Sequence, residues 1–411
     1  KRISDLAALL EVTRQLAVTI ELPALLSSIE QAARRVLNCE RATVFLYDPQ
    51  RQELRSKIAT GLDELRISAE AGISGQVVRT RQPINVPDAY ADPRFNAEVD
   101  RRTGCRTRNM LTFPLIDYDG QLVGVLQLLN KIGGAFDAYD QMLAQSLSAQ
   151  VAVALQRQRL LEQYAEKQRM QRDLDIARRI QEDFLPSADP RVPGFDIAGW
   201  NRPADETGGD YYDFLDLDDG SLVIAVADAT GHGIGPALLA AECRAMLRAI
   251  VSLTQDLPSV LAQTNKLLCA DLPGGRFVTA FVGLLQPSQS RLVYISAGHG
   301  PVLFYEAAGR NVRQIEASAL PLGIVPSTDF APAEQLRFAP GDMMVVMTDG
   351  FFEACGADGR QFGIDRIGQL IGRYSSISAG ALIQQIYRQV SSFTDSTRQR
   401  DDLTAVVIKR L

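Results

Sequence analysis

The spacing of apolar residues in the first third of the chain predicts short strands mixed with helices. Apolar residues recur every three or four positions over residues 1–20, which predicts an amphipathic helix with heptad spacing. A second helix is expected from about Pro23 to Leu37, and Gly72 opens a short third one. Further apolar runs predict strands near Ala42–Tyr47, Glu53–Thr60, Met110–Ile116 and Leu122–Asn130. A long loop containing Pro83, Pro87 and Pro93 is expected between the second and third of these strands. Since the elements do not alternate strictly as βαβ, we expect an antiparallel sheet with flanking helices.

The run from Tyr139 to Leu185 contains neither Pro nor Gly, which predicts one long helix of roughly 65–70 Å. Pro186 follows it and would end it. The apolar stripe on this helix is interrupted by a polar middle around Glu166–Arg172, as in a solvated spacer. An isolated helix of this length gains little without packing its apolar face, so we favour a parallel pair in a homodimer.

Residues 194–411 alternate repeatedly between apolar runs and turns, which predicts two stacked antiparallel sheets with helices outside them. Helices are expected near Pro236–Thr254, Ser259–Leu272, Ile364–Tyr374 and Ala379–Phe393. The whole chain is therefore α+β. Its predicted parts are an N-terminal helix (1–20), a first domain (21–155), a coiled-coil or switch helix (156–188) and a second domain (189–411).

Composition narrows the classes of function. A net charge of −6 over 411 residues gives no electrostatic footprint for nucleic acid. The five cysteines are unclustered and lack CxxC spacing, so we expect reduced thiols in a cytoplasmic protein. We expect no membrane segment and see no signal-peptide pattern; because the first residue is Lys1, we expect the natural start to lie upstream.

Acidic residues stand at the ends of four apolar runs in the second half of the chain. Asp210 follows two glycines, Asp228 follows Leu222–Ala227, and Asp349 follows Met343–Met347 with Thr348 between. The pair Asp401 and Asp402 comes directly before the apolar run at 403–408. Uncompensated charges beside buried strands are costly, and hard divalent cations bind carboxylate and carbonyl oxygens. The pattern therefore predicts a carboxylate metal centre built from strands far apart in sequence.

Two segments of the chain resemble known protein families. Asn130-Lys131, Phe136 and Asp140 resemble the Asn-Lys…Phe…Asp-Glu signature of GAF domains in cyclic-nucleotide phosphodiesterases and adenylyl cyclases, with Gln141 in the last acidic position. The resemblance implies a sensor domain for a small molecule, with a cyclic nucleotide as the candidate ligand. Physically, a contact between Lys131 and Asp140 would pin the last strand to the following helix, and a purely structural role for the signature stays open beside ligand binding.

The second half resembles the SpoIIE/RsbU branch of the metal-dependent PPM (type 2C) serine/threonine protein phosphatases. Six motifs fall in family order: Gly208-Gly209-Asp210, Asp228–Gly233, Ser296–Pro301, Leu320–Gly323, Thr348–Ala354 and Asp401–Thr404. The stretch Leu174–Pro186 also looks like the regulatory switch helix that precedes such domains. The resemblance implies an α-β-β-α sandwich that hydrolyses phosphoserine or phosphothreonine with two divalent ions, manganese or magnesium.

The resemblance also implies residue roles. Asp210 and Asp228 would hold the metal pair, Ala229 would add its carbonyl, Asp349 and Asp401 would complete one shell, and Asp402 lies near. Asp210, Asp228, Asp349 and Asp401 would thus be the catalytic set. No protein nucleophile is required, and the chain contains no Cys-x5-Arg loop.

Four further residues have two interpretations each. His232 and His299, the only histidines, would suit a general acid, but a histidine that packs at a glycine turn fits as well. Arg202 and Arg400 lie beside the acidic motifs and would suit substrate phosphate or an exposed ion pair.

Two hypotheses for the whole chain follow. The first is a GAF-regulated dimeric phosphatase acting on a phosphorylated partner protein of the anti-sigma-factor-antagonist type. The second is a GAF ligand receptor whose phosphatase-like half serves as a docking domain. The four main aspartates favour the first, because a scaffold has no physical need for so much clustered negative charge.

Overall fold

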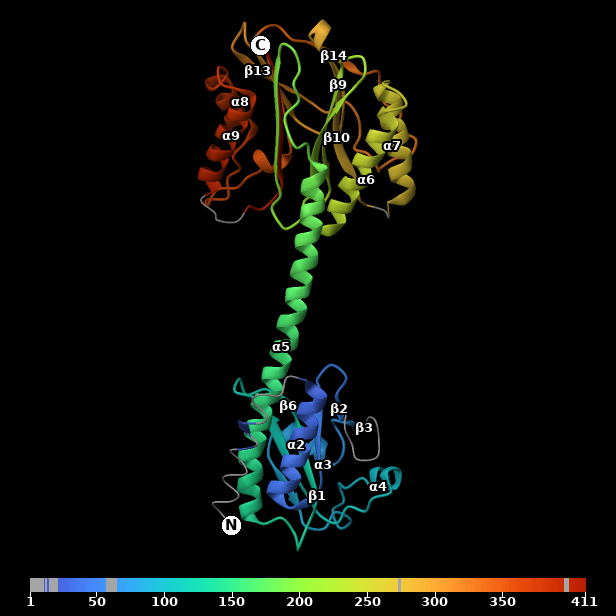
Figure 1. Ribbon diagram of the computed structural model, residues 1–411, viewed down its shortest axis with the longest axis vertical. Coiled ribbons are helices and arrows are strands. Elements are labelled where there is room, and N and C mark those ends of the chain that lie inside the picture. Colours follow the sequence, from blue (N-terminus) through green and yellow to red (C-terminus); the bar gives the residue numbers. More distant parts are fainter. Residues whose placement is uncertain (1–10, 12, 15–20, 57–64, 273–274, 395–398) are drawn as a thin grey trace. The chain divides into compact units, whose positions relative to one another are not determined.

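The computed structural model describes residues 11, 13–14, 21–56, 65–272, 275–394 and 399–411 (Figure 1). The chain divides into two compact units, Lys1–Arg169 and Met170–Leu411. The long helix α5 (Ala138–Phe184) contributes residues to both units and confirms the helix expected from Tyr139 to Leu185. The helix predicted for residues 1–20 lies almost entirely outside the described residues.

The first unit is a six-stranded antiparallel sheet of order β3-β2-β1-β6-β5-β4. Its strands are β1 (Cys39–Asp48), β2 (Glu53–Ser56), β3 (Leu65–Ser68), β4 (Ile84–Val86), β5 (Met110–Ile116) and β6 (Leu122–Lys131). Its other helices are α2 (Leu22–Leu37), α3 (Gly72–Thr80) and α4 (Glu98–Thr103).

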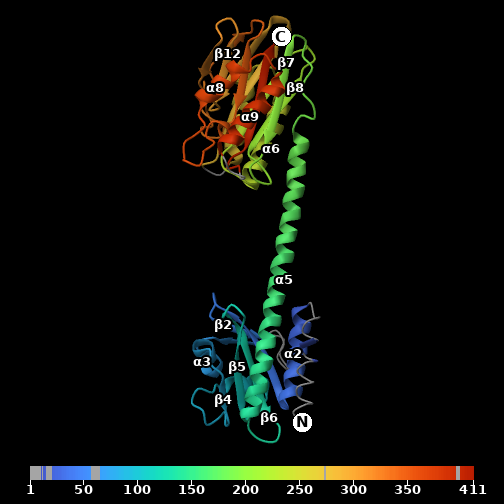
Figure 2. The same cartoon turned by 90° about the vertical axis from the view of Figure 1, so that its left-hand side faces the viewer.

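Each face of this sheet has its own apolar core because side chains alternate along the strands. On one face, Val44, Phe113 and Leu126 pack with α2 and with the start of α5. On the other face, Phe45 and Val125 pack with Val77 of α3. The sheet therefore lies between α2 and α5 on one side and α3 on the other (Figure 2).

The second unit contains two five-stranded antiparallel sheets, of order β14-β11-β10-β9-β8 and β13-β12-β15-β16-β7. The strands are β7 (Phe195–Arg202), β8 (Asp210–Asp216), β9 (Leu222–Ala229), β10 (Val278–Gln286), β11 (Arg291–Ala297), β12 (Val302–Glu306), β13 (Asn311–Ile315), β14 (Glu334–Arg337), β15 (Met343–Met347) and β16 (Leu403–Arg410). The helices are α6 (Ile234–Val251), α7 (Leu257–Asp271), α8 (Ile364–Arg373), α9 (Ala379–Thr394) and two short 3-10 turns, η1 (Pro287–Gln289) and η2 (Asp349–Phe351).

The second unit has four layers, in the order helices, sheet, sheet and helices, and an apolar core lies between each two neighbouring layers. The central core joins the two sheets through residues such as Tyr212, Phe281 and Val346. An outer core packs α6 and α7 on the first sheet, and another packs α8 and α9 on the second. The two helix pairs accordingly flank the strands on opposite sides (Figure 1), which confirms the predicted sandwich.

The differences from the expected elements concern short segments. Strands β3 and β4 and helix α4 were not expected, and β4 and α4 lie where the sequence predicted only a long loop. These elements contain four, three and six residues, which is too short for a hydrophobic period to be recognised in the sequence. Among the described residues, no helix is both long enough and apolar enough to cross a bilayer.

Candidate functional site

In the second unit, acidic residues of β8 and β9 face each other at one end of these two adjacent strands. Asp210, the first residue of β8, is the register partner of Asp228 on β9. Opposed residues of an antiparallel pair lie on the same face, so both carboxyl groups share one side of the sheet. That side also carries Tyr212 and Val226 and is turned toward the second sheet. The two carboxylates thus lie at the edge of the central core.

The second sheet contributes through the ends of β15 and β16. Asp349 begins the turn η2 directly after Thr348, while Asp401 and Asp402 precede Leu403 of β16. Thr348 donates its backbone N–H to the carbonyl of Thr404 at 3.0 Å, and the Thr348 hydroxyl donates to Asp210 Oδ2 at 2.7 Å. One buried threonine therefore joins the acidic end of the second sheet to the acidic end of the first.

Asp402 is committed to backbone hydrogen bonds. Its Oδ1 accepts from the N–H of Ala204 at 2.7 Å and its Oδ2 from the N–H of Gly209 at 2.6 Å. The loop after β15 approaches so closely that a Cβ at Gly350 would lie 2.1 Å from the carbonyl oxygen of Asp402. Glycine at 350 therefore lets the loop of Asp349 pass beside the loop of Asp401 and Asp402.

The electrostatics confirm that these carboxylates share one environment. Burial, followed by the charges of Asp349 and Asp401, raises the pKa of Asp228 to about 7. Burial and the neighbouring charge of Asp401 raise the pKa of Asp349 to about 6. Burial raises the pKa of Asp210 well above its ordinary value, and the charges of Asp228 and Asp402 add to the rise. Burial also raises the pKa of Asp402.

The donor set fits divalent cations. None of these five aspartates forms an ion pair with a Lys, Arg or His in the described part of the chain. Mutual repulsion and burial therefore leave negative charge that a hard cation would balance through oxygen ligands. Within the described ranges, no three His, Cys, Asp or Glu side chains are already gathered in the manner of a metal shell. Asp210 and Asp402 instead direct oxygens at Thr348 and Gly209, so binding of a cation would require these side chains to readjust.

The two histidines lie in different surroundings. His232 is exposed, and its Nδ1 lies 3.5 Å from Asp205 Oδ2. His299 is buried, its Nδ1 lies 3.0 Å from the Thr279 hydroxyl, and burial lowers its pKa to about 4. The packing interpretation of His299 is therefore correct, and a residue held neutral at such a low pKa is a poor general acid at neutral pH.

The two arginines line a hollow of about 760 Å³ beside Asp401. Arg202 hydrogen-bonds the hydroxyl of Tyr387, and its guanidinium carbon lies 5.3 Å from the centroid of the Tyr387 ring. The exposed ion pair considered for Arg202 and Arg400 is not found with any described carboxylate. Gln399 ties the two motifs together by donating to the carbonyls of Arg202 and Asp401.

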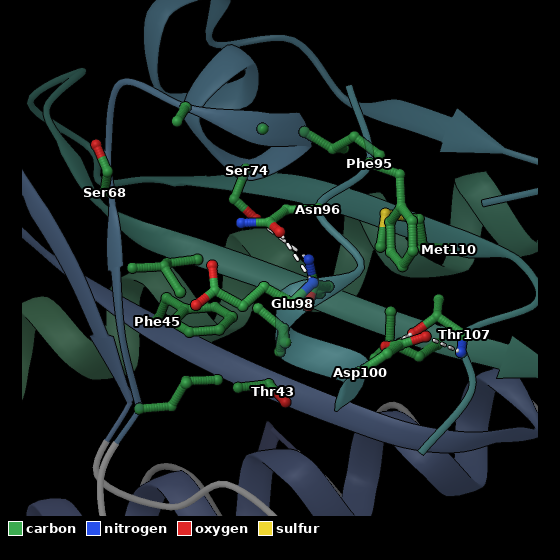
Figure 3. Close-up of a pocket in the computed structure, with 18 of the residues that line it drawn as sticks. Thr43, Phe45, Ser68, Ser74, Phe95, Asn96, Glu98, Asp100, Thr107 and Met110 are labelled. Carbon is green, nitrogen blue, oxygen red and sulfur yellow. Dashed lines mark hydrogen bonds between the residues drawn. The ribbon is translucent and has the colours of Figure 1, made fainter. Parts of the chain in front are cut away.

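The first unit holds a separate cavity of about 350 Å³ (Figure 3). Its lining combines apolar groups such as Phe45, Phe95 and Met110 with polar ones. Asp100 accepts hydrogen bonds from both the N–H and the hydroxyl of Thr107, at 2.6 and 2.7 Å. Cavities of a few hundred Å³ that are mainly apolar with a few placed polar groups are typical small-molecule sites.

The Asn-Lys…Phe…Asp signature does not line this cavity. Lys131 Nζ contacts Asp140 Oδ1 at 2.6 Å and the carbonyl of Leu37 at 2.8 Å, as the sequence predicted for the first of these. Asn130 accepts from the N–H of Arg108 and donates to Glu40. The structural interpretation of the signature is therefore correct: it joins β6 to α5 and to the end of α2.

Comparison with known proteins agrees with these two folds. Residues 21–155 match the GAF domain family, and residues 218–411 match the family described as Stage II sporulation protein E (SpoIIE). The chain is 30% identical over 248 residues to Phosphoserine phosphatase RsbU of Bacillus subtilis (strain 168), covering 59% of this chain and 72% of that protein. It is 31% identical over 203 residues to Dual 3',5'-cyclic-AMP and -GMP phosphodiesterase 11 of Drosophila melanogaster, covering 44% of this chain but 14% of that protein.

A solved structure shows the fold of the second unit. The SiaA-PP2C domain of Pseudomonas aeruginosa matches with a TM-score of 0.52 at 22% identity, covering 60% of this chain and 98% of that domain. The paired sheets, their outer helices and the acidic strand ends define a PP2C-type phosphatase fold. The chain belongs to the SpoIIE/RsbU family of PPM phosphatases, and it carries a GAF domain.

Proposed function

We propose that this chain is a metal-dependent protein serine/threonine phosphatase regulated by its GAF domain. The observation that carries the proposal is that carboxylates from two sheets act on one another: the charges of Asp349 and Asp401 raise the pKa of Asp228, and the charge of Asp228 raises the pKa of Asp210. When bound there, two divalent ions, manganese or magnesium, would activate water for attack on the phosphoryl group and neutralise its charge.

The chain's own residues would prepare this site. Asp210, Asp228, Asp349 and Asp401, with the carbonyl of Ala229, would supply oxygen ligands, and Asp402 would lie behind them. Asp402 fixes the loop that carries Asp210 by accepting two backbone hydrogen bonds. Thr348 orients the carboxylate of Asp210. The same carboxylates, crowded and buried, would attract cations rather than phosphate until the charge is balanced.

The hollow beside Asp401 supports a protein substrate. It is lined by Arg202 and Arg400 and reaches Gly350 next to Asp349. Guanidinium groups pair well with phosphate and carboxylate oxygens. We expect a segment bearing phosphoserine or phosphothreonine to lie there, on a phosphorylated regulatory protein of the anti-sigma-factor-antagonist type. The five cysteines are free thiols, in keeping with a cytoplasmic site of action.

The cavity of the GAF domain supports a small-molecule ligand. Its aromatic and polar lining would suit a cyclic nucleotide, the ligand that the GAF resemblance suggests. Calorimetry with cyclic AMP and cyclic GMP tests this ligand, and the absence of heat with both would remove the assignment.

The catalytic proposal is tested by hydrolysis of p-nitrophenyl phosphate with and without manganese. Wild-type protein is expected to show manganese-stimulated turnover, and Asp349→Asn is expected to lose nearly all of it. A phosphate-release assay on phosphorylated antagonist proteins then tests the substrate class. If wild type shows no metal-stimulated turnover on either substrate, the docking-domain hypothesis is favoured instead.

A further inference from the structure

The side-chain carboxamide of Gln181 forms hydrogen bonds with both the N–H and the carbonyl of Gly208. Gln181 Nε2 donates to the carbonyl of Gly208 at 2.8 Å, and the N–H of Gly208 donates to Gln181 Oε1 at 3.1 Å. Nε2 also lies 3.5 Å from the carbonyl of Ala237 in the first turn of α6. The carboxamide therefore joins α5 to the loop between β7 and β8 and touches the start of α6.

Gly208 lies directly between Gln181 and the carboxylate centre. A Cβ at position 208 would be 2.5 Å from Asp402 Oδ2, so the backbone there touches the Asp402 carboxylate. The next residue, Gly209, donates its N–H to the same Asp402 oxygen at 2.6 Å, and Asp210 follows. Any shift of the Gly208 backbone would consequently move the donor of Asp402 and the carboxylate of Asp210.

Gln181 is itself held by the packing of the last turn of α5. The guanidinium carbon of Arg244 on α6 lies 5.1 Å from the centroid of the Phe184 ring. Leu185 packs against both the central core and the core under α6 and α7. Arg248, one turn further along α6, makes two hydrogen bonds to Asp213 on β8, at 2.6 and 2.7 Å. The end of α5 thus packs against α6, and Arg248 joins α6 to β8.

We propose that Gln181 is a positioning residue for the carboxylate centre, and that the affinity of the centre for divalent cations depends on its carboxamide. This inference rests on the proposed function. A carboxamide carries both the acceptor for the N–H and the donor for the carbonyl of one residue. Glutamate would keep the size and the acceptor, but it would lose the donor and add negative charge beside five aspartates. Groups that orient metal ligands from behind typically change metal affinity about 10–100-fold when they are removed.

The experiment compares Gln181→Glu and Gln181→Ala with Gln171→Ala in the full chain. Gln171 is a matched control because it lies on the same helix and its amide donates to a side chain, that of Glu206, at 3.3 Å. Manganese binding is measured by titration calorimetry without substrate, and amide hydrogen exchange of residues 204–211 is measured without metal. Circular dichroism checks that each variant is folded, and Gln181→Glu retains the volume and helix propensity of the native residue.

Both Gln181 variants are expected to bind manganese about 10–100-fold more weakly than wild type and to exchange the Gly208 amide faster, while Gln171→Ala matches wild type. Wild-type affinity in the Gln181 variants would overturn the inference, as would equal weakening in all three variants. In either case, hydrolysis of p-nitrophenyl phosphate by the wild-type protein would leave the proposed function standing. A wild-type protein that neither binds manganese nor hydrolyses this substrate would overturn both.

Discussion

At the scale of single residues, Thr348 decides how the two sheets meet at the acidic edge. Its hydroxyl donates to Asp210 Oδ2 and accepts from the N–H of Thr404 at 3.0 Å. Thr348→Val keeps the shape but removes the donor, so we expect manganese to activate turnover with about 10–100-fold lower affinity. Thr348→Ser should retain most of the native affinity. The measurement is the manganese dependence of p-nitrophenyl phosphate hydrolysis.

The control for Thr348 is Thr328→Val. The Thr328 hydroxyl donates to the carbonyl of Val325, three residues away on the surface. This variant should leave the manganese dependence unchanged. An unchanged dependence in Thr348→Val as well would contradict the role given to the threonine.

His299 gives a prediction for the pH dependence of stability. Its pKa in the folded protein is about 4 against an ordinary 6.5, because the imidazole is buried. Between these values the unfolded chain binds a proton that the folded chain does not, so stability falls as pH falls from 6.5 to 4. The loss reaches roughly 3 kcal/mol for this one group. Above pH 6.5 the imidazole is neutral in both states and adds no slope.

The measurement for His299 is the free energy of unfolding by urea at several pH values between 4 and 7.5. His299→Gln should show a shallower fall in stability below pH 6.5 than wild type. His232→Gln is the matched control, since the His232 side chain is 84% exposed. If the free energy of unfolding falls in parallel with pH for wild type and His299→Gln, the prediction that the buried His299 imidazole is neutral is wrong.

At the scale of elements, the pair formed by Lys131 and Asp140 joins β6 to the first turn of α5. The two side chains are 17% and 6% exposed, and Asp140 also accepts from the N–H of Asp137 at 3.1 Å. Asp140→Ala leaves a largely buried ammonium without its carboxylate partner and should destabilise the GAF domain by about 3–5 kcal/mol.

The double variant Lys131→Met, Asp140→Leu tests the cause of that loss. It removes both charges and should be less destabilising than Asp140→Ala alone, because no unpaired charge remains. Thermal unfolding followed by circular dichroism measures both variants. A double variant that is the less stable of the two would show that the charges themselves hold β6 and α5 together.

The elements also show what a sequence can reveal. Periodicity and the absence of Pro and Gly were enough to predict α5, and the apolar run at 110–116 coincides with β5. Strands β3 and β4 exist because they pair with β2 and β5, which local sequence does not encode. Likewise, the acidic strand ends predicted the candidate site, which stays a prediction, but the contact of Thr348 with Asp210 spans 138 residues and follows only from the stacked sheets. The resemblance of Leu174–Pro186 to a switch helix included Gln181, but the contact of its carboxamide with Gly208 follows only from the fold.

At the scale of the whole molecule, the sensor and phosphatase units share the single helix α5. Exposed apolar side chains on α5 include Val153, Leu160 and Tyr164, each about half exposed or more. Their spacings of seven and four residues place them on one face, as in a coiled-coil seam. We therefore keep the prediction of a homodimer paired along this face.

Light scattering at micromolar concentration tests the pairing, with an expected mass of about twice the 45.0 kDa chain. Leu160→Glu places one carboxylate from each helix in the seam. Because the two carboxylates repel each other and the apolar contact is lost, the protein should shift toward monomer. Glu166→Gln, in the polar middle of the same helix, should remain dimeric. A wild-type monomer would exclude the paired helix. A Leu160→Glu dimer of unchanged affinity would place the contact on another surface, and regulation of the phosphatase would then have to pass through that surface.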